Sequence, residues 1–356
     1  MASSFRDGWS VGIPTFNRYH LLKQALASAE SQSHKPAEII VSDNCSTDQT
    51  GTASISDTSI RFRYFRHSKP VPPIENFRNA LAMCETEYFS WLQDDDYLFP
   101  GTGEAFSKAF ALNDQAVAVI GYAYHARDID RIRSNQTTLW GPPAFQMDFD
   151  CGTPMEVSVG CLVPWLTFFW PGFSPVAAFK TQALLEVMND VPDFYGCSSY
   201  LFEQYVIASL NKLGSIVYLP SVLGVLRDHT SRVTGSTHYD PEAWHAAWLE
   251  LYSYLAELMP KDTSDIEHFF STRINDFDNT EILDFHSCLM SRNEHPLSQL
   301  LLSWLAKYRH IDFPQVEENA KPDDSQTFLN RSRRVARLLL PPILYSLKHR
   351  IHSRLG

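Results

Sequence analysis

The chain has 356 residues, which is long enough to bury one large domain with an appendage, or two domains of modest size. Hydrophobic residues make up 44% of it and charged residues 20%, as is usual for globular proteins, so disorder is excluded as the main state. A formal net charge of -11 argues against general binding to nucleic acid.

The six cysteines are scattered along the chain without a Cys-x-x-Cys pair. This pattern argues against a zinc ribbon, a redox motif and a disulfide framework, and it suits a reducing compartment. The first nine residues lack the basic start and apolar core of a secretory signal. We therefore expect a cytoplasmic protein.

The N-terminal residues are typical of alternating strands and helices. A short apolar strand is predicted over 9–13, a loop with proline and asparagine over 14–18, and a helix over 19–31. The apolar run 37–42 predicts a second strand, which ends in the polar loop 43–48. This β-α-β order predicts a parallel sheet with right-handed crossovers.

A third strand at 60–66 and a helix at 74–84 lead to the most informative strand, 88–92. This apolar, β-favouring run stops abruptly at Gln93, and three aspartates follow it. In open α/β sheets, ligands bind outside the carboxyl ends of the strands. The aspartates that stand at this position are Asp94, Asp95 and Asp96.

The remaining chain gives a coarser pattern. A strand is expected at 116–123, and the aromatic-rich stretch 154–173 contains prolines and glycines that exclude it as a membrane span. A helix is predicted over 200–212 and a strand over 215–219. Beyond residue 241 the pattern is helical to about residue 313, which indicates an appended bundle.

Three consecutive aspartates repel one another strongly if they are buried without compensation. A divalent cation relieves this repulsion, because Mg²⁺ and Mn²⁺ prefer oxygen ligands and commonly bridge one or two carboxylates to phosphate oxygens. The alternative is a solvated acidic turn that caps the next helix. The three residues alone leave both interpretations open.

Three short segments of the chain carry a resemblance to a known family, through both their order and their separation. They are Ile13-Pro14-Thr15-Phe16-Asn17-Arg18, Val41-Ser42-Asp43-Asn44-Cys45-Ser46-Thr47-Asp48 and Trp91-Leu92-Gln93-Asp94-Asp95-Asp96. Together they resemble the family-2 glycosyltransferases, closely over residues 9–100 and more loosely over 173–234. The resemblance implies an α/β, GT-A fold, the nucleotide-diphospho-sugar transferase architecture with a Rossmann-like mixed sheet, and a C-terminal helical appendage.

The domain organisation that we expect from this resemblance has three parts. A GT-A glycosyltransferase domain spans 1–235 and divides into a donor half, 1–115, and an acceptor half, 116–235. A helical region covers 236–325. A basic amphipathic tail covers 326–356.

For the donor, the resemblance implies that Asp43 accepts a hydrogen bond from a ring N–H of the base. Uracil, thymine and guanine offer this group and cytosine does not, so we expect a UDP-, dTDP- or GDP-sugar. The alternative is that Asp43 is a turn residue that bonds its own backbone. The other donor-binding residues implied are Pro14, Thr15 and Arg18 beneath the nucleotide, Asp94 at the ribose, and Asp95.

For metal and catalysis, the resemblance implies that Asp96 binds Mn²⁺ or Mg²⁺, with His229 as a further ligand and Arg227 at the diphosphate. Glu203 is the implied catalytic base, since a carboxylate within hydrogen-bond reach can take the proton of the acceptor hydroxyl. The family has a Glu-Asp pair there, and this chain has Glu203 followed by Gln204. The alternatives are a surface glutamate and a structural histidine.

On the acceptor side, Trp170 in the aromatic stretch is the expected contact, and ordinary core is the alternative. In the tail, the apolar centre 338–345 is flanked by basic clusters, as in segments that lie in an anionic membrane surface. A disordered basic tail is the alternative. Membrane binding favours a glycan or lipid-linked acceptor and a peripheral location on the inner face of the plasma membrane.

The predicted reaction is a metal-dependent single displacement with inversion, from a nucleoside-diphosphate sugar to an acceptor hydroxyl. One alternative is a catalytically silent sugar-nucleotide binder, which Gln204 motivates. The other is a sugar nucleotidyltransferase, which commonly has a glycine-rich phosphate loop that residues 14–18 lack.

Overall fold

The computed structural model describes residues 5–126, 138–140, 154–157, 176–191 and 201–227, with Leu251, Tyr254 and Leu255. All of them belong to one compact unit, Met1–Met259. The domain boundaries predicted at residues 235 and 325 and the basic tail lie outside the described residues. Of the predicted helical region, 236–325, the described residues are Leu251, Tyr254 and Leu255, which are helical. Within the part of the chain that is described, no helix is long and apolar enough to cross a membrane.

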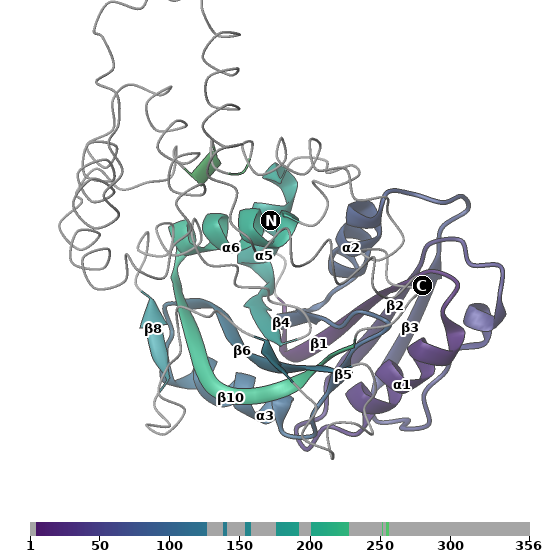
Figure 1. The fold of residues 1–356 in the computed structure, drawn as a ribbon, viewed down its shortest axis with the longest axis horizontal. Coiled ribbons are helices and arrows are strands. Elements are labelled where there is room, and N and C mark those ends of the chain that lie inside the picture. The colour runs from purple at the N-terminus through teal and green to yellow at the C-terminus, as the bar shows by residue number, and fades with distance from the viewer. Residues whose placement is uncertain are drawn as a thin grey trace, which may run out of the picture. The chain divides into compact units, whose positions relative to one another are not determined.

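One mixed sheet organises the described residues (Figure 1). Its strands are β1 (Arg6–Thr15), β2 (Glu38–Asp43), β3 (Arg61–Arg66), β4 (Thr86–Trp91), β5 (Tyr97–Leu98), β6 (Ala116–Ala126), β7 (Thr138–Trp140), β8 (Met155–Val157), β9 (Ala177–Lys180) and β10 (Ser215–Arg227). Their order is β3-β2-β1-β4-β9-β6-β10-β5, with β7 paired to β6 and β8 to β10.

The strand directions divide the sheet into two parallel parts. β3, β2, β1 and β4 are parallel, as the β-α-β order predicts. β6 and β10 are also parallel to each other. Between these parts, β9 runs antiparallel to both β4 and β6 and joins them. The sheet is therefore mixed, as the resemblance implies. β5, β7 and β8 also run antiparallel to the strands with which they pair, so the parallel pattern holds among β3, β2, β1 and β4 and between β6 and β10.

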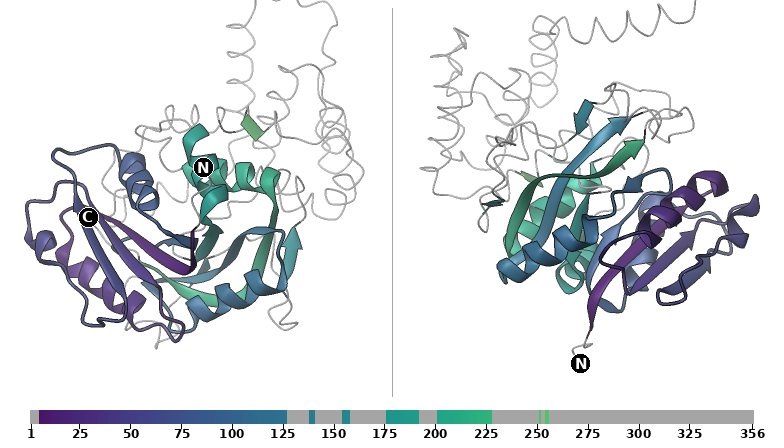
Figure 2. Two further views of the ribbon diagram at one scale, coloured as in Figure 1. Left: turned by 180° about the vertical axis from the view of Figure 1, so that it is seen from behind. Right: turned by 90° about the horizontal axis from the view of Figure 1, so that it is seen from below.

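Helices cover both faces of the sheet (Figures 1 and 2). They are α1 (Tyr19–Glu30), the 3₁₀ helix η1 (Gln49–Thr52), α2 (Pro73–Ala82), α3 (Thr102–Leu112), α5 (Thr181–Asp190) and α6 (Phe202–Leu213). α1 and α3 lie on one face, and α2, α5 and α6 lie on the other. In α1, Leu22, Ala25, Leu26 and Ala29 recur at helical spacing and pack into the core.

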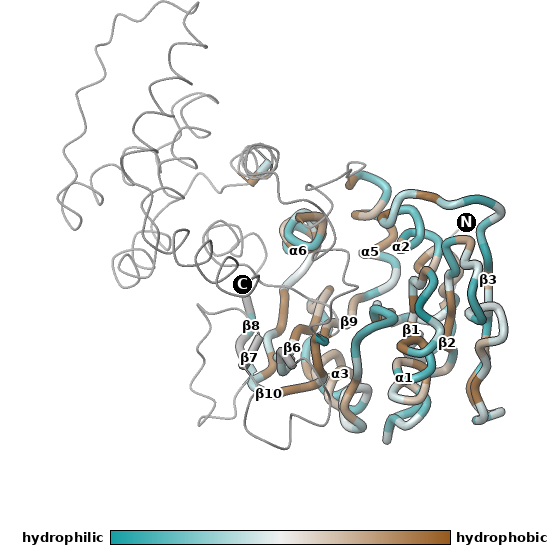
Figure 3. The backbone as a smooth tube through the Cα atoms, turned by 45° about the vertical axis from the view of Figure 1, so that its right-hand side comes forward, coloured by the Kyte–Doolittle hydropathy of each residue, from teal (hydrophilic) through white to brown (hydrophobic). Residues whose placement is uncertain are grey.

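β1 lies at the centre of the N-terminal part and is buried from Trp9 to Thr15. Val11 and Ile13 pack into the core on the α1 side. On the other side, a Cβ atom at Gly12 would collide with the ring of Phe89, so the glycine allows close packing there. Figure 3 shows that β6 and β10 are also largely hydrophobic, which explains why apolar runs alone identified most of the buried strands.

β10 corrects the predicted strand end at residue 219. It continues through Pro220 to Arg227 beside β6. The register shifts between Tyr218 and Val222 and again before Gly224, and these irregularities absorb the proline, which cannot donate to a regular ladder. Arg227 is therefore the last residue of a strand and its backbone is held by the sheet.

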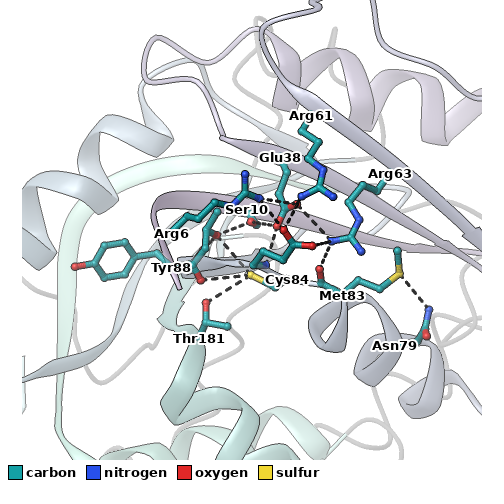
Figure 4. A network of polar contacts seen from close by, with 12 residues as sticks. Arg6, Ser10, Glu38, Arg61, Arg63, Asn79, Met83, Cys84, Tyr88 and Thr181 are labelled. Carbon is teal, nitrogen blue, oxygen red and sulfur yellow. Dashed lines mark hydrogen bonds and ion pairs between the residues drawn. The ribbon is translucent and has the colours of Figure 1, made fainter. Parts of the chain in front are cut away.

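A buried polar network ties the amino ends of the strands together (Figure 4). Glu38, the first residue of β2, is fully buried. Its Oε1 accepts hydrogen bonds from Ser10 Oγ at 2.8 Å and from the Glu85 N–H at 2.9 Å. The guanidinium groups that face Oε2 belong to Arg6, Arg61 and Arg63, at 3.7, 3.9 and 3.6 Å. The carboxylate thus links β1, β2, β3 and the start of β4.

We expect Glu38→Ala to lower the free energy of unfolding by about 2–4 kcal/mol, because it leaves two buried donors without their acceptor. The midpoint of urea unfolding measures the loss. Glu85→Ala is the control, since the Glu85 side chain is 46% exposed and its ion pairs are screened by water. Equal shifts in the two variants would contradict the importance of the buried carboxylate.

Candidate active site at the carboxyl ends of the strands

The carboxyl ends of four strands meet at one edge of the sheet and carry most of the predicted site residues. Thr15 ends β1, Asp43 ends β2, Asp94 to Asp96 follow β4, and Arg227 ends β10. The loop after β4 is fixed by the bond from the Leu92 N–H to the Gly12 carbonyl at 2.9 Å. The parallel direction of these strands therefore brings the four segments to one edge of the sheet.

Arg18, in the loop between β1 and α1, bridges two of the aspartates. Its Nη1 lies 3.0 Å from Asp94 Oδ1 and 3.0 Å from Asp95 Oδ2. All three aspartates are buried, with exposed fractions of 3% or less, so the alternative of a solvated turn does not hold. This internal cation offsets part of the repulsion between the neighbouring carboxylates.

Asp94 is the most tightly surrounded of the three. Its Oδ2 accepts from Thr15 Oγ1 at 2.7 Å and from the Phe16 N–H at 3.4 Å. Burial, followed by the neighbouring Asp95 carboxylate, raises the pKa of Asp94 to about 6, although Arg18 acts in the opposite direction. A carboxylate whose ionised form is disfavoured in this way gains stability when more positive charge is bound beside it.

Asp96 connects the cluster to the end of β10. Its Oδ1 accepts from the Arg227 N–H at 2.9 Å. The Arg227 guanidinium donates from Nη1 to Gln24 Oε1 on α1 at 2.9 Å, while Nε and Nη2 are buried without a hydrogen-bond partner in the described part of the chain. Buried guanidinium donors of this kind suit phosphate oxygens.

The loops after β1 and β2 hold each other in place. The Asn17 N–H donates to Ser46 Oγ at 2.8 Å, and the Thr47 N–H donates to Asn17 Oδ1 at 2.7 Å. Asn17 and Cys45 have φ angles of 52° and 63°, in the left-handed region that non-glycine residues seldom adopt. Such backbone strain persists only where the surrounding contacts enforce it, and it concentrates at functional sites.

Asp43 is fully buried and both of its carboxylate oxygens have protein partners. Oδ1 accepts from the Ser46 N–H at 2.9 Å, the bond that the turn interpretation requires. Oδ2 accepts from the Tyr64 hydroxyl and lies 3.5 Å from Arg66 Nε. The role of Asp43 at the base of the donor remains a prediction.

The start of α6 lies against the end of β4 through aromatic contacts. The Phe202 ring packs edge-on against Trp91 and Phe77, with ring centroids 6.4 and 5.3 Å apart. This packing places Phe202, the residue before Glu203, beside the last residue of β4. Glu203 is partly exposed and Gln204 is fully buried, so the carboxylate is the more accessible of the two side chains.

The other predicted residues have different outcomes. Pro14 is buried in β1, paired with Ser42 of β2. Trp170 and His229 lie outside the described residues. Residues at this edge that the sequence analysis missed are Phe16, Gln24, Tyr64 and Arg66. The ring of Phe16 is 47% exposed, and an aromatic residue within a polar loop was the available signal for it.

The donor set of this edge suits Mg²⁺ or Mn²⁺. Among the described residues, no group of three or more His, Cys, Asp or Glu side chains is arranged to hold a metal by itself. Mg²⁺ commonly takes one or two protein carboxylates and completes its shell with water and substrate phosphates. The carboxylates of Asp94 to Asp96 provide oxygen ligands of that kind.

Sequence comparisons agree with these features. Residues 10–164 match the model of glycosyl transferase family 2. A GalNAc(5)-diNAcBac-PP-undecaprenol beta-1,3-glucosyltransferase of Campylobacter jejuni is 38% identical over 95 residues, or 26% of this chain and 31% of that protein. An uncharacterized glycosyltransferase of Rickettsia typhi is 31% identical over 91 residues, or 26% of this chain and 28% of that protein. The match thus spans less than a third of these relatives.

Solved structures share the fold at low sequence identity. TarS 1–349 of S. aureus in complex with UDP-GlcNAc has a TM-score of 0.56 at 18% identity, over 83% of this chain and 87% of that chain. The same protein in complex with UDP has a TM-score of 0.54 at 15% identity, over 89% and 97%. Residues 10–164 are therefore similar to glycosyl transferase family 2, and the fold of the chain is the GT-A fold.

Proposed function

We propose that this protein is a metal-dependent, inverting glycosyltransferase that moves a sugar from a nucleoside-diphosphate sugar to a hydroxyl of a glycan or lipid-linked acceptor. The observation that carries the proposal is the buried cluster Asp94 to Asp96 at the carboxyl end of β4, held by Arg18 and Arg227. It lies inside the segment that matches glycosyl transferase family 2.

Asp96, with Asp95, would hold Mn²⁺ or Mg²⁺ together with the diphosphate of the donor, and Asp94 would face the ribose. The ion, when bound, would neutralise negative charge on the departing nucleoside diphosphate. The protein contributes aspartate carboxylates whose orientation is fixed by hydrogen bonds from Thr15 Oγ1 to Asp94 and from the Arg227 N–H to Asp96. Carboxylates that are held rigidly keep their geometry around an ion and need no reorganisation during the reaction.

Arg227 is the residue that we assign to the diphosphate. Its backbone is fixed at the end of β10, and Gln24 orients its guanidinium. The two buried donor nitrogens Nε and Nη2, which have no hydrogen-bond partner among the described residues, would then donate to phosphate oxygens. The positive charge of Arg227 adds to that of Arg18 and lowers the repulsion between the aspartates and an anionic donor.

Glu203 is the proposed general base. Its carboxylate takes the proton from the acceptor hydroxyl while the oxygen bonds to the anomeric carbon, and the bond from that carbon to the phosphate oxygen breaks. One displacement of this kind inverts the anomeric centre. Its position in the first turn of α6 suits a carboxylate, because the amino end of a helix favours negative charge.

The acceptor that we propose is a glycan or a lipid-linked molecule. The C. jejuni relative is named as a glucosyltransferase of an undecaprenol-linked glycan, and TarS binds UDP-GlcNAc in its crystal structure. The UDP-GlcNAc bound to TarS supports a nucleotide-sugar donor, and the name of the C. jejuni relative supports a glycan or lipid-linked acceptor. The basic tail, 326–356, supports a cytoplasmic enzyme that is peripheral on the inner face of the plasma membrane. Trp170 is the proposed acceptor contact.

A screen of UDP-, dTDP- and GDP-sugars for hydrolysis, with and without Mn²⁺, tests the function directly. We expect one donor to be hydrolysed in the presence of the metal and to raise the melting temperature, because ligands that bind only the folded state stabilise it. If no nucleotide-sugar is hydrolysed or stabilises the fold, the proposal fails.

We expect Asp96→Asn to lower turnover of that donor by at least about 100-fold, because an amide is a weaker ligand for a hard cation. The initial rate at saturating Mn²⁺ measures this loss. Asp114→Asn is the matched control, since Asp114 is exposed beyond α3, and it should leave the rate unchanged. Full activity in Asp96→Asn would contradict the metal role.

For Glu203→Gln we expect transfer to an acceptor to fall by about 100- to 10,000-fold, because the amide cannot take the proton. Donor affinity, measured by calorimetry with Mn²⁺ present, should remain within about 3-fold of wild type, as the donor site is distinct. Glu186→Gln on the exposed side of α5 is the control. An unchanged transfer rate in Glu203→Gln would favour another residue as the base. A wild-type protein that binds the donor without any turnover would favour a catalytically silent binder.

A further inference from the structure

The carboxylate of Asp43 receives more hydrogen-bond donors than its turn requires. The bond from the Ser46 N–H to Oδ1 closes the turn by itself. The second oxygen accepts from the Tyr64 hydroxyl and lies 3.5 Å from Arg66 Nε. Both of these additional partners come from β3, the strand next to β2 at the edge of the sheet.

The register of β2 and β3 explains how both side chains reach the same carboxylate. Arg66 stands opposite Asp43, and Tyr64 stands opposite Val41. Residues two apart on a strand point to the same face, so the phenol and the guanidinium converge there. Arg66 also donates from Nη2 to the Ser46 carbonyl at 2.7 Å. It therefore contacts both ends of the turn.

The chemistry of these contacts limits what else Asp43 can bind. An ionised carboxylate only accepts hydrogen bonds. Burial, and then the hydrogen bond to Asp43, raise the pKa of Tyr64, so its hydroxyl keeps the proton that it donates. Lone pairs that are not taken by Ser46 and Tyr64 remain open only to a further donor.

We propose that Tyr64 and Arg66 are positioning residues that fix the Asp43 carboxylate as an acceptor and thereby select donor nucleotides whose base carries a ring N–H. The inference rests on the proposed function and on the role that the resemblance implies for Asp43, as the acceptor of a hydrogen bond from the base. Uracil, thymine and guanine satisfy the requirement, whereas cytosine presents a bare ring nitrogen, which a carboxylate repels. Sites built around a hydrogen-bond partner reject analogues that lack it.

Calorimetric titration of the full chain with UDP, dTDP, GDP and CDP, in buffer with Mn²⁺, tests this selection. In wild type we expect the tightest of the first three to bind at least about 10-fold more tightly than CDP, as a hydrogen bond to a charged group allows. In Tyr64→Phe we expect this preference to fall by at least about 5-fold. Arg66→Gln should lower it in the same direction.

Two further variants serve as controls. Asp43→Asn should remove most of the preference, because an amide offers both a donor and an acceptor to the base. Tyr88→Phe should leave the preference unchanged, since Tyr88 is a partly buried tyrosine on β4 that stacks on Phe110. A comparison of melting temperatures shows whether each variant is folded at the temperature of the titration.

The outcomes separate this inference from the function on which it rests. If wild type shows the preference and Tyr64→Phe keeps it in full, or weakens all four nucleotides alike, the inference is overturned and the proposed function stands. If wild type binds the four nucleotides equally, selection by Asp43 is overturned. If none of the four binds, both proposals fall.

Discussion

Three neighbouring carboxylates buried at the end of β4 require positive charge and hydrogen-bond donors close by. Arg18 supplies a cation between Asp94 and Asp95, Thr15 supplies a hydroxyl, and the end of β10 supplies a backbone N–H to Asp96. These contacts with the aspartates join the loop after β1 to the last residue of β10. A divalent cation, held together with a diphosphate, would balance the negative charge of the aspartates that Arg18 does not balance.

The same sheet carries two buried carboxylate networks with different consequences. At the amino ends of the strands, Glu38 faces three arginines and two hydrogen-bond donors, so its charge is compensated within the protein. At the carboxyl ends, Asp94, Asp95 and Asp96 lie side by side, and Arg18 is the cation that pairs with Asp94 and Asp95 among the described residues. A compensated network stabilises the fold, whereas a charge excess is suited to a ligand. The network that stabilises the fold thus lies at the amino ends of the parallel strands, and the cluster suited to a ligand lies at their carboxyl ends.

Sequence patterns identified the elements whose signals are local. The runs 37–42 and 88–92 are buried on both faces, so their apolar residues are continuous, and each motif follows such a run directly. β9 was missed because four residues carry too little periodicity, and the end of β10 was misplaced because Pro220 resembles a terminator. The contacts of Arg18 with Asp94, and of Tyr64 with Asp43, join residues far apart in the chain, which no local pattern contains.

Titration of the full chain with Mn²⁺, followed by the paramagnetic resonance of the free ion, tests the central claim that the aspartates bind a cation together with a diphosphate. The titration is made alone and with UDP, dTDP or GDP. The account predicts that one nucleotide raises the Mn²⁺ affinity by at least about 10-fold, because coupled ligands strengthen each other reciprocally, and that Asp96→Asn abolishes this gain. An Mn²⁺ affinity that no nucleotide changes, or a gain that survives in Asp96→Asn, would contradict it.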